Sequence, residues 1–573
     1  MTSKSQQAMP KWRFSLVALL LAGLAALLIW RVLSLQVLDA RFLNAQGDAR
    51  TIRSETIPAY RGVISDRNGE PLAVSTPVAS VWLNPRQMIG VEQDYRELSR
   101  LIDIPVKKIT SRIHQHSSKG FIYLRRQMSP SAADQIMALG LKGVYSQQEY
   151  KRYYPVGEVA AHLVGFTNID DQGQEGMELA FDDWLSGMSG SKTVLKDLHG
   201  HVIRDIEQKQ VAESGKELAL SIDIRLQYLA YRELKAALQR SKAKSGSVVL
   251  MDSTTGEVLA MVNQPSYNPN NRRRLNPADL RNRAVTDVFE PGSTMKALTV
   301  VAALNSGKFD EHSVIDTNPG YIRVGSKTLL DPANYGKIDL ATVLTKSSQV
   351  GTSKIALELE DGAVRDVLQR FGFGRSTGSG FPGESTGLLP DRANWRPIER
   401  VTLAYGYGLS VTPLQLAQAY SVLANDGKFN PASLLRQDSP SKGEQIISSE
   451  RSQQVVRMLE SVIEKGSGKS AQIAGYSVAG KTGTVHKLVN GRYADDRYMA
   501  IFAGMAPASD PRLVVVVMIN EPSTDHYYGG EVAAPVFSRV MSDALRILDI
   551  TPDRFSAEQM SELQAQAGGR KSV

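Results

Sequence analysis

The sequence predicts a mixed α/β fold in at least two domains behind a single membrane helix, and three features lead to this prediction. The chain has 573 residues, which is too many for one hydrophobic core. A stretch near the N-terminus is apolar over a length that suits a bilayer. The C-terminal half has strand-like runs at both ends and helical patterns between them, so its sheet must be assembled from segments that are distant in the sequence.

The apolar stretch covers residues 14–33 and is interrupted only by Arg31, which gives it about the 20 residues that span a bilayer core. A positively charged flank precedes it, so we expect residues 1–13 to form a cytoplasmic tail. A cleaved signal peptide would have a shorter apolar region that ends at a small-x-small site, whereas Ile-Trp-Arg-Val follows here. We therefore expect an uncleaved anchor at residues 14–36, with the rest of the chain outside the cytoplasm.

Residues 37–215 are expected to form a spacer or interaction domain. The segment alternates short β-like runs with turn signals, as in Gly62–Ser65 followed by Asp66–Gly69. It shows no nucleophile-and-base pair and no phosphate-binding loop. Glu213–Lys216 marks a junction, because a new strand-like run begins at Leu218.

Residues 216–550 are expected to form an α/β domain. Two strand pairs are predicted, one joined by a turn through Gly256 and one across an Asp-Pro turn near the C-terminus. The residues from 551 to 573 are polar and contain glycines, so we expect a flexible tail. The predicted elements are a helix at Arg225–Ser241, strands at Gly246–Met251, Val258–Val262, Tyr498–Gly504 and Leu513–Ile519, and a helix at Ala533–Leu548.

The composition excludes several classes of site. The chain has no cysteine, so it forms no disulfide, no thiolate metal site and no cysteine nucleophile. Its eight histidines are scattered, and their two close pairs lack the further ligands that a metal needs. The net charge of +8 is spread along the chain, which argues against nucleic-acid binding. We expect no metal and no cofactor.

Ser293 and Lys296 lie three residues apart where a glycine-containing loop runs into an apolar helical pattern. On a helix this spacing brings a hydroxyl and an amine within hydrogen-bond reach. One interpretation is a helix-capping serine followed by a solvated lysine. The other is a nucleophile with its base, which requires that burial or a neighbouring cation lower the pKa of the lysine.

Two further segments favour the catalytic interpretation. One contains Ser347, Ser348 and Gln349 before a helical run. The other is a glycine-flanked strand in which Thr482 and Thr484 point the same way, so both hydroxyls can meet one carboxylate. The full strand segment is Lys481, Thr482, Gly483 and Thr484.

With three motifs in this order, the sequence resembles the penicillin-binding proteins, serine acyl-transferases with the signature Ser-x-x-Lys, Ser-x-Asn and Lys-Thr-Gly. It is most similar to the class B, single-pass members that cross-link septal peptidoglycan, the FtsI or penicillin-binding protein 3 type. The resemblance extends from the anchor to about residue 548. It is supported by the stretches Arg61–Gly69, Gly176–Glu178, Phe381–Glu384 and Tyr405–Gly408.

The resemblance implies the roles of the site residues. Ser293 would attack the D-Ala-D-Ala end of a donor stem peptide, with Lys296 as base and a proton shared with Ser347 and Lys481. The substrate carboxylate would be held by Lys481, Thr482 and Thr484, beside Gly483. The backbone N–H groups of Ser293 and Thr484 would form the oxyanion hole. Tyr527 and Tyr528 would form an aromatic wall, unless they are an ordinary pair of loop aromatics.

The sequence departs from the family pattern at two positions. Gln349 stands where the motif has asparagine, so its amide must reach the substrate from a different position. His486 stands where relatives can have another basic side chain, and it would make anion binding depend on pH. These departures fit a specialised copy of the division enzyme with altered activity.

Other functions remain open beside the transpeptidase. One is a division scaffold with a decayed catalytic site, and another is a D,D-carboxypeptidase that transfers the acyl group to water. A penicillinase-type β-lactamase would need a Glu-x-x-Leu-Asn stretch between Gln349 and Lys481, and the sequence has none.

The resemblance also implies the architecture, the location and the partners. It implies an elongated, mostly-β or α+β pedestal of the dimerisation type, and a transpeptidase domain with an antiparallel sheet flanked by helices. The location would be the bacterial inner membrane at the division septum, with the catalytic domain in the periplasm. Implied partners are peptidoglycan stem peptides, β-lactams, a membrane glycan polymerase of the FtsW type and other division proteins.

Overall fold

The computed structural model describes residues 11–42, 52–91, 93–196, 202–273, 275–439, 442–523 and 526–555. Most of the predicted cytoplasmic tail and of the predicted flexible tail lies outside these residues. The chain divides into two compact units, each made of several segments. The first unit takes in Met1–Tyr60, Pro77–Tyr150 and Gly187–Ser214, and the second unit Arg61–Thr76, Lys151–Ser186 and Gly215–Val573. The second unit thus includes two segments of the region predicted as the pedestal, and the predicted domain limits stay a prediction.

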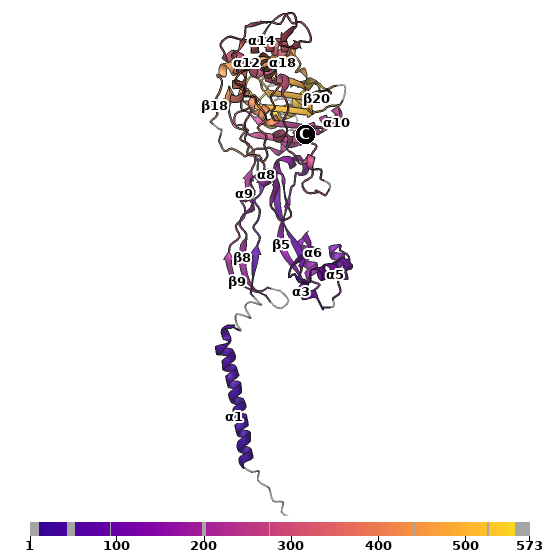
Figure 1. Cartoon of the computed structure of the whole chain (residues 1–573), viewed down its shortest axis with the longest axis vertical. Helices are drawn as coiled ribbons and strands as arrows, with labels where there is room; N and C mark the ends of the chain where they lie inside the picture. The colour runs from indigo at the N-terminus through magenta and orange to yellow at the C-terminus, as the bar shows by residue number, and fades with distance from the viewer. Residues whose placement is uncertain are drawn as a thin grey trace, which may run out of the picture. The chain divides into compact units, whose positions relative to one another are not determined.

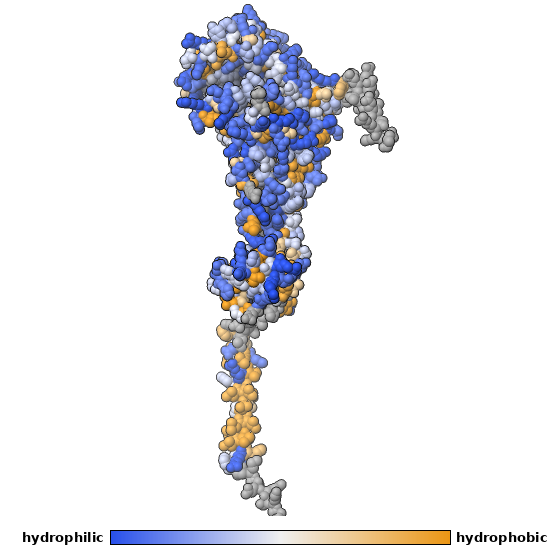
Figure 2. Space-filling view, turned by 90° about the vertical axis from the view of Figure 1, so that its right-hand side faces the viewer, coloured by the Kyte–Doolittle hydropathy of each residue, from blue (hydrophilic) through white to orange (hydrophobic). Residues whose placement is uncertain are grey.

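The first unit begins with α1 (Lys11–Leu33; Figure 1), which a π-helical turn, η1 (Ser34–Leu38), continues. Together they form a helix of 28 residues that is long and apolar enough to cross a membrane, and its most apolar part is not buried in the protein. Figure 2 shows its side chains as a largely hydrophobic surface. The predicted anchor at residues 14–36 lies within this helix.

The remainder of the first unit combines a three-stranded antiparallel sheet, in the order β1-β8-β9, with a small α/β part. The core of the α/β part is formed by side chains such as Val81, Ile102, Ile109 and Ile136. The elements are β1 (Ile52–Ile57), β3 (Pro71–Leu83), α3 (Pro85–Met88), α4 (Arg96–Ile102), α5 (Val106–Gln115), β4 (Ile122–Met128), α6 (Pro130–Met137), β5 (Val144–Tyr153), β8 (Gly190–Lys196) and β9 (Val202–Gln210). Strands β3 and β5 continue into the second unit.

The second unit is built on a five-stranded antiparallel sheet in the order β12-β11-β21-β20-β19. Both predicted strand pairs belong to it, and the strand that contains the third motif forms its edge. The strands are β11 (Ser245–Asp252), β12 (Val258–Gln264), β19 (Ala479–Val489), β20 (Arg492–Ala506) and β21 (Leu513–Asn520). The main helices are α10 (Ile224–Ser241), α12 (Lys296–Asn305), α13 (Leu340–Thr345), α14 (Gln349–Glu358), α15 (Ala363–Arg370), α16 (Pro397–Ala404), α17 (Pro413–Ala424), α18 (Ser449–Lys465) and α20 (Ala534–Ile547).

The side chains of the central strands point alternately to the two faces of this sheet, and both faces are buried. On one face, Val248 and Val515 pack in a cluster with residues of α10 and α20. On the other, Val249 and Val514 pack in a second cluster with residues of α12 and α17. Because successive residues of a strand point to opposite faces, runs of valine supply both cores at once. The predicted architecture, a sheet flanked by helices behind an apolar N-terminal helix, is confirmed.

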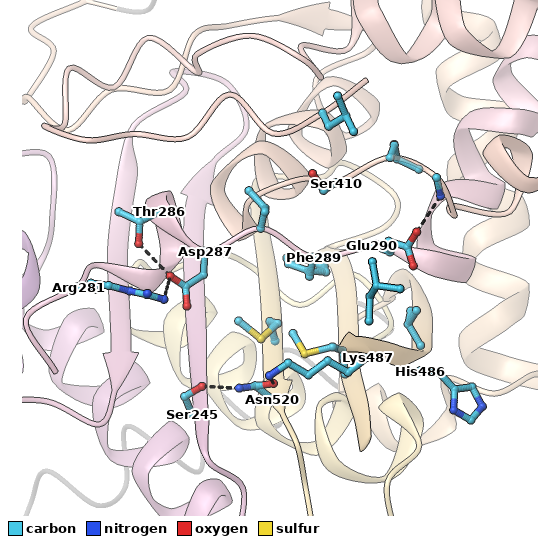
Figure 3. A pocket seen from close by; sticks show the side chains of 18 residues that line it. Ser245, Arg281, Thr286, Asp287, Phe289, Glu290, Ser410, His486, Lys487 and Asn520 are labelled. Carbon is cyan, nitrogen blue, oxygen red and sulfur yellow. Dashed lines mark hydrogen bonds and ion pairs between the residues drawn. The ribbon is translucent and has the colours of Figure 1, made fainter. Parts of the chain in front are cut away.

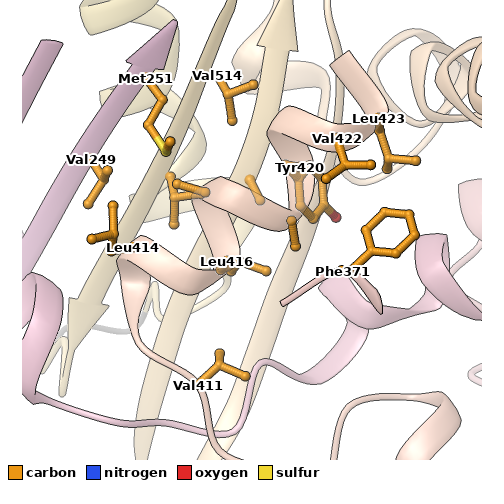
Figure 4. Packing of buried hydrophobic residues seen from close by; sticks show 14 of the residues in the cluster. Val249, Met251, Phe371, Val411, Leu414, Leu416, Tyr420, Val422, Leu423 and Val514 are labelled. Carbon is orange, nitrogen blue, oxygen red and sulfur yellow. The ribbon is translucent and has the colours of Figure 1, made fainter. Parts of the chain in front are cut away.

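Helix α17 lies at the centre of the second unit, and all of its residues are buried. A capping box between Thr412 and Gln415 starts it. Figure 4 shows its side chains packed against Val249 and Val514 of the sheet. The hydroxyl of Tyr420 donates a hydrogen bond of 2.8 Å to the carbonyl oxygen of Thr294. The buried helix therefore supports the turn that contains Ser293.

Two of the stretches that suggested the family meet in a buried ion cluster of the second unit. Arg61, in the loop before β2 (Ile64–Ser65), forms ion pairs of 2.7 Å with Glu178 of α8 (Gly176–Ala180) and with Asp182. Arg152 pairs with the other carboxylate oxygen of Glu178 at 2.6 Å. We call Arg61 and Arg152 the arginine pair.

Candidate active site

Ser293 lies in a single 3₁₀ turn, η4 (Gly292–Met295), and α12 begins directly after it at Lys296. The interpretation of Ser293 as a helix cap is wrong, because neither η4 nor α12 has a side-chain cap. Gly292 has a φ of +56°, so the chain enters the turn in the left-handed region and not in the extended conformation of a capping residue.

Neighbouring residues pack very closely against this turn. A Cβ atom on Gly292 would lie 2.5 Å from Cγ2 of Val485 in β19. A Cβ atom on Gly406 would lie 2.1 Å from the carbonyl oxygen of Gly292, and the N–H of Gly292 donates to the carbonyl of Gly406 at 3.0 Å. Two glycines therefore allow the backbone of the serine turn to lie directly between the edge strand and the Tyr405–Gly408 loop.

Lys296 and Lys481, which we call the lysine pair, converge on Ser347. Lys296 Nζ donates to the carbonyl oxygen of Ser347 at 2.5 Å and to its Oγ at 3.2 Å. Lys481 Nζ donates to the same Oγ at 3.1 Å. Both lysines are buried, at 3% and 0% exposure. Among the described residues the hydroxyl of Ser293, half-buried at the turn, makes no hydrogen bond, so Lys296 is joined to Ser347 and not to Ser293.

Burial sets the protonation of the lysine pair. It lowers the pKa of Lys296 to about 7, against the opposing charge of Asp331. It also lowers the pKa of Lys481 to about 7, and the charge of Lys296 adds to this effect. An amine in this range is uncharged in part of the molecules at neutral pH and can accept a proton.

No cluster of three or more His, Asp or Glu side chains that could hold a metal occurs among the described residues.

The second motif forms the turn between α13 and α14. Ser347 has a φ of +53°, a conformation that costs free energy in a residue other than glycine. Ser348 caps α14 by accepting from the N–H of Gly351 at 2.8 Å. The carboxylate of Asp331 accepts from Ser348 Oγ at 2.5 Å and from the N–H of Gln349 at 2.6 Å. The sequence analysis missed Asp331, because a single acidic residue beside a proline in a loop gives no motif signal.

Burial raises the pKa of the Tyr405 phenol, and the side chain of Gln349, which lies nearby, opposes the effect. The amide that replaces the family asparagine is thus placed beside an aromatic residue of the Tyr405–Gly408 loop.

The hydroxyls of both threonines in β19 form hydrogen bonds with residues outside the strand. Thr482 Oγ1 and Ser467 Oγ lie 2.6 Å apart in a hydrogen bond. Thr484 Oγ1 accepts from the N–H of Gly529 at 2.9 Å. A Cβ atom on Gly483 would lie 3.0 Å from the carbonyl oxygen of Pro291, so the small residue allows this strand to approach the serine turn.

The predicted aromatic wall forms a stack that extends onto β20. The ring centroids of Tyr527 and Tyr498 lie 3.9 Å apart, and those of Tyr527 and Tyr528 lie 4.6 Å apart. The ring of His486 lies 4.7 Å from Tyr498, and its Nδ1 lies 2.9 Å from the carbonyl oxygen of Ala494. The two predicted tyrosines are therefore part of an ordered row.

A cavity of about 780 Å³ lies beside the serine turn (Figure 3). Glu290, three residues before Ser293, lines it. The carboxylate of Glu290 accepts from the N–H of Gly408 at 2.8 Å and from the hydroxyl of Tyr493 at 2.9 Å. Sequence reasoning missed Glu290 as well, although it lies inside the stretch that contains the first motif.

Comparisons with known proteins agree with this geometry. The model of the penicillin-binding protein transpeptidase domain matches residues 246–542, and that of the penicillin-binding protein dimerisation domain matches residues 56–220. The chain is 45% identical over 564 residues to the peptidoglycan D,D-transpeptidase FtsI of Escherichia coli, which covers 97% of this chain and 95% of the relative.

Two further relatives extend the comparison. The chain is 44% identical over 543 residues to the probable peptidoglycan D,D-transpeptidase PbpC of Pseudomonas aeruginosa, covering 95% of this chain and 96% of the relative. The crystal structure of penicillin-binding protein 3 from Mycobacterium tuberculosis in complex with aztreonam superposes with a TM-score of 0.68 at 27% identity, covering 87% and 98% of the two chains. The chain therefore belongs to the penicillin-binding proteins, in the class B group of the FtsI or penicillin-binding protein 3 type.

Proposed function

We propose that this chain cross-links peptidoglycan stem peptides as a serine D,D-transpeptidase and that Ser293 is its nucleophile. The convergence of the buried lysine pair on Ser347, the first residue of the second motif, supports the proposal most strongly. Ser293 attacks the carbonyl carbon of the penultimate D-alanine of a donor stem peptide. The peptide bond to the last D-alanine breaks, D-alanine leaves, and an acyl-enzyme remains.

The lysine pair and Ser347 form the proton route of this reaction. Lys296, uncharged in part of the molecules at pH 7, takes the proton of the Ser293 hydroxyl as the C–O bond forms. The proton then reaches the leaving amine through Ser347 Oγ, which both lysines contact. A hydroxyl suits this position because it accepts and donates at the same time.

The remaining site residues bind the substrate. Thr482 and Thr484, with Lys481, hold the substrate carboxylate, and Gly483 leaves room for the peptide beside β19. The backbone N–H groups of Ser293 and Thr484 bind the developing oxyanion, an interaction worth about 3 kcal/mol per donor in acyl-transfer enzymes. In the same proposal Gln349 orients the peptide from its position beside Tyr405, and Tyr527 and Tyr528 line the opposite side.

Covalent labelling tests the proposal. The full-length protein in detergent is incubated with a fluorescent penicillin, and we expect one label, lost in Ser293→Ala. Absence of the label from the unaltered protein, or its persistence in Ser293→Ala, would refute the assignment. The relative from M. tuberculosis is a precedent, since it was crystallised with the β-lactam aztreonam.

The alternatives differ from the proposal in what they do with the acyl group. If the chain is a decayed scaffold, Gln349→Asn leaves labelling absent, whereas a working site changes its acylation rate. If it is a carboxypeptidase, mass spectrometry of the products shows only the hydrolysed donor even when an amine acceptor is present.

We further propose that α1 anchors the chain in the inner membrane of a bacterium, with the catalytic unit in the periplasm at the division septum. An FtsW-type glycan polymerase and other division proteins would be its partners. Because the chain has no cysteine, a single Asp510→Cys variant reports its orientation cleanly. A membrane-impermeant maleimide should label this variant in intact spheroplasts, and labelling only after lysis would place the catalytic unit in the cytoplasm.

A further inference from the structure

Helix α5 of the first unit and the segment that follows it contain no acidic residue. Residues 104–133 include six lysines and arginines and no aspartate or glutamate. On α5, Lys107, Lys108 and His114 are exposed on the side opposite to the buried Ile109 and Ile113. A basic helix side is most often only solvated, so the charge by itself assigns it no ligand.

The cations of this run are mostly not neutralised by the protein. Of the six, only Arg126 forms an ion pair among the described residues, with Glu149 at 3.2 Å. Arg112 and Arg125 donate to backbone carbonyl oxygens, which carry no charge. The three lysines of the run are exposed to solvent. This part of the unit therefore keeps a net positive charge at its surface.

Two exposed apolar side chains lie beside these cations. Ile89 is 44% exposed and lines a cavity of about 870 Å³ together with His114, near the end of α5. Phe121 is 41% exposed and follows Lys119 by two positions, and its ring centroid lies 4.8 Å from that of Trp82. Figure 2 shows hydrophilic and hydrophobic surface next to each other on this part of the unit.

Arg86 of α3 connects the apolar side chains with the segment after α5. Its Nε donates to the carbonyl oxygen of Ser118 at 2.6 Å, so α3 and that segment lie side by side. Arg86 is itself exposed. These residues form one amphipathic surface, which we call the α5 face. Its members are Arg86, Ile89, Lys107, Lys108, Lys119 and Phe121.

The covalent chain keeps the α5 face close to any membrane that α1 crosses. The face belongs to the unit that begins with α1, the helix proposed as the anchor. Only residues 39–51 separate η1 from β1, and a fully extended chain of this length spans at most roughly 50 Å. Weak individual contacts suffice at such short range, because the effective concentration of the headgroups is high.

Lysines and apolar side chains on one exposed surface have the chemistry that binds a lipid headgroup layer. The ammonium groups attract anionic headgroups, and their methylene stems, like Ile89 and Phe121, can enter the boundary between headgroups and acyl chains. An acidic protein partner is better matched by arginine, whose planar guanidinium binds a carboxylate through two hydrogen bonds. Three of the four cations of the α5 face are lysines.

We propose that the α5 face docks on the anionic phospholipid headgroups of the membrane in which α1 anchors the chain. This inference rests on the proposed anchoring by α1 and is independent of the proposed transpeptidase activity. It gives the chain a second contact with the bilayer, one that depends on lipid charge and on salt.

A single fluorophore reports the docking, because the chain has no cysteine of its own. Ser117, exposed in the turn after α5, is changed in the full-length protein by Ser117→Cys and labelled with nitrobenzoxadiazole, and the protein is placed in lipid nanodiscs. A nitroxide on the lipid headgroups quenches this fluorophore when the α5 face lies on the bilayer. We expect strong quenching in discs with equal parts of phosphatidylcholine and phosphatidylglycerol, and little in phosphatidylcholine alone.

Salt gives a test that needs no further variant. At about 1 M salt the Debye length is about 3 Å, so the difference between the two lipid compositions should disappear. Equal quenching in both compositions at low salt, or a difference that high salt leaves unchanged, overturns the inference.

Removing the three lysines tests the α5 face itself. The variant combines Lys107→Gln, Lys108→Gln and Lys119→Gln, all at exposed positions. The ratio of docked to free protein in the anionic discs, obtained from the quenching, should fall about tenfold. Ile89→Gln should lower the same ratio about threefold, because less apolar surface enters the headgroup layer. An unchanged ratio in the lysine variant refutes the assignment.

A matched control removes the same charge elsewhere. It replaces three exposed lysines of the second unit by Lys327→Gln, Lys428→Gln and Lys465→Gln. The docked ratio should stay unchanged in this variant. If it falls as far as in the α5 variant, the effect is one of net charge, and the α5 face is not the docking surface.

Two further outcomes are decisive. Poly-glutamate added to the phosphatidylcholine discs stands for an acidic protein partner, and a fluorescence change with it but none with phosphatidylglycerol would assign the face to such a partner and overturn the inference. Failure of the protein to enter nanodiscs defeats the proposed anchoring by α1, whereas entry without quenching in anionic discs defeats this inference alone.

Discussion

Two pairs of buried cations in the same unit are stabilised in opposite ways. The arginine pair shares the carboxylate of Glu178, and Asp182 adds a second carboxylate to Arg61. Burial has the largest single influence and would lower the pKa of Arg61, but the charge of Glu178 and the hydrogen bonds to Glu178 and Asp182 together outweigh it, so that pKa is raised. The lysine pair shares only the uncharged hydroxyl of Ser347, and burial lowers its pKa values to about 7.

This difference distinguishes a buried charge that stabilises the fold from a buried charge that takes part in catalysis. A guanidinium cannot release its proton in a protein, so it must be neutralised by carboxylates. An ammonium can release its proton, and a site that gives it no carboxylate in contact makes it a base. The arginine pair should therefore govern stability and the lysine pair should govern reactivity.

Lys296→Met tests the lysine pair, the reactive half of this comparison, and its effect on acylation is the largest that we expect. Methionine fills a similar volume without an amine, so acylation by a penicillin should fall by about 10³-fold. The free energy of unfolding should stay unchanged or rise, because a buried cation has been removed. Stopped-flow acylation and urea denaturation measure the two quantities. A large loss of stability with little loss of rate would assign the lysine a structural role.

Glu178→Gln tests the arginine pair, the structural half of this comparison. Both members of the arginine pair lose a charged partner and cannot deprotonate, so the free energy of unfolding should fall by about 3–5 kcal/mol. The acylation rate of the molecules that remain folded should be unchanged. Urea denaturation of the full-length protein in detergent gives the first value, and labelling below the unfolding transition gives the second.

The pH dependence of acylation sharpens the comparison. The pKa of Lys296 is lowered to about 7, so the amine is protonated, and unable to accept a proton, as the pH falls through this value. The acylation rate should be level above about pH 8 and fall about tenfold for each pH unit below about 7. Because the two lysines interact, the midpoint belongs to the pair. A rate that is flat between about pH 5 and 7 would contradict a lysine base.

Tyr420→Phe has the smallest expected effect. The change removes the hydrogen bond to the carbonyl oxygen of Thr294, which should lower the free energy of unfolding by about 1 kcal/mol. The burial of the lysine pair is untouched, so the midpoint of the pH profile should not move. A shifted midpoint would show that Tyr420 supports the lysines as well as the serine turn.

The sequence predicted the sheet well, and the reason is local. Gly246–Met251 and Leu513–Ile519 are rich in valine, and such runs form strands that are buried on both faces. The motif residues could be predicted because each lies in a short stretch with its own signature. The convergence of Lys481 on Ser347 could be expected only from the family, since 134 positions separate them.

The contacts of the loops could not be predicted. Asp331 reaches the turn of the second motif through backbone N–H groups, which leave no trace in the sequence of either partner. The left-handed conformation of Ser347 is likewise imposed by its surroundings, since serine has no preference for it. In each case the tertiary structure decides what the local sequence leaves open.

The close packing at Gly292 and Gly406 limits how this protein can evolve drug resistance. Any side chain at Gly406 would collide with the backbone of the serine turn, and any side chain at Gly292 would collide with Val485. Both glycines also have positive φ angles, of +86° and +56°. Substitution is therefore disfavoured at Gly292 and Gly406 by their backbone conformation, and at Gly406 also by the fixed backbone of the serine turn, so resistance to β-lactams must arise at other positions.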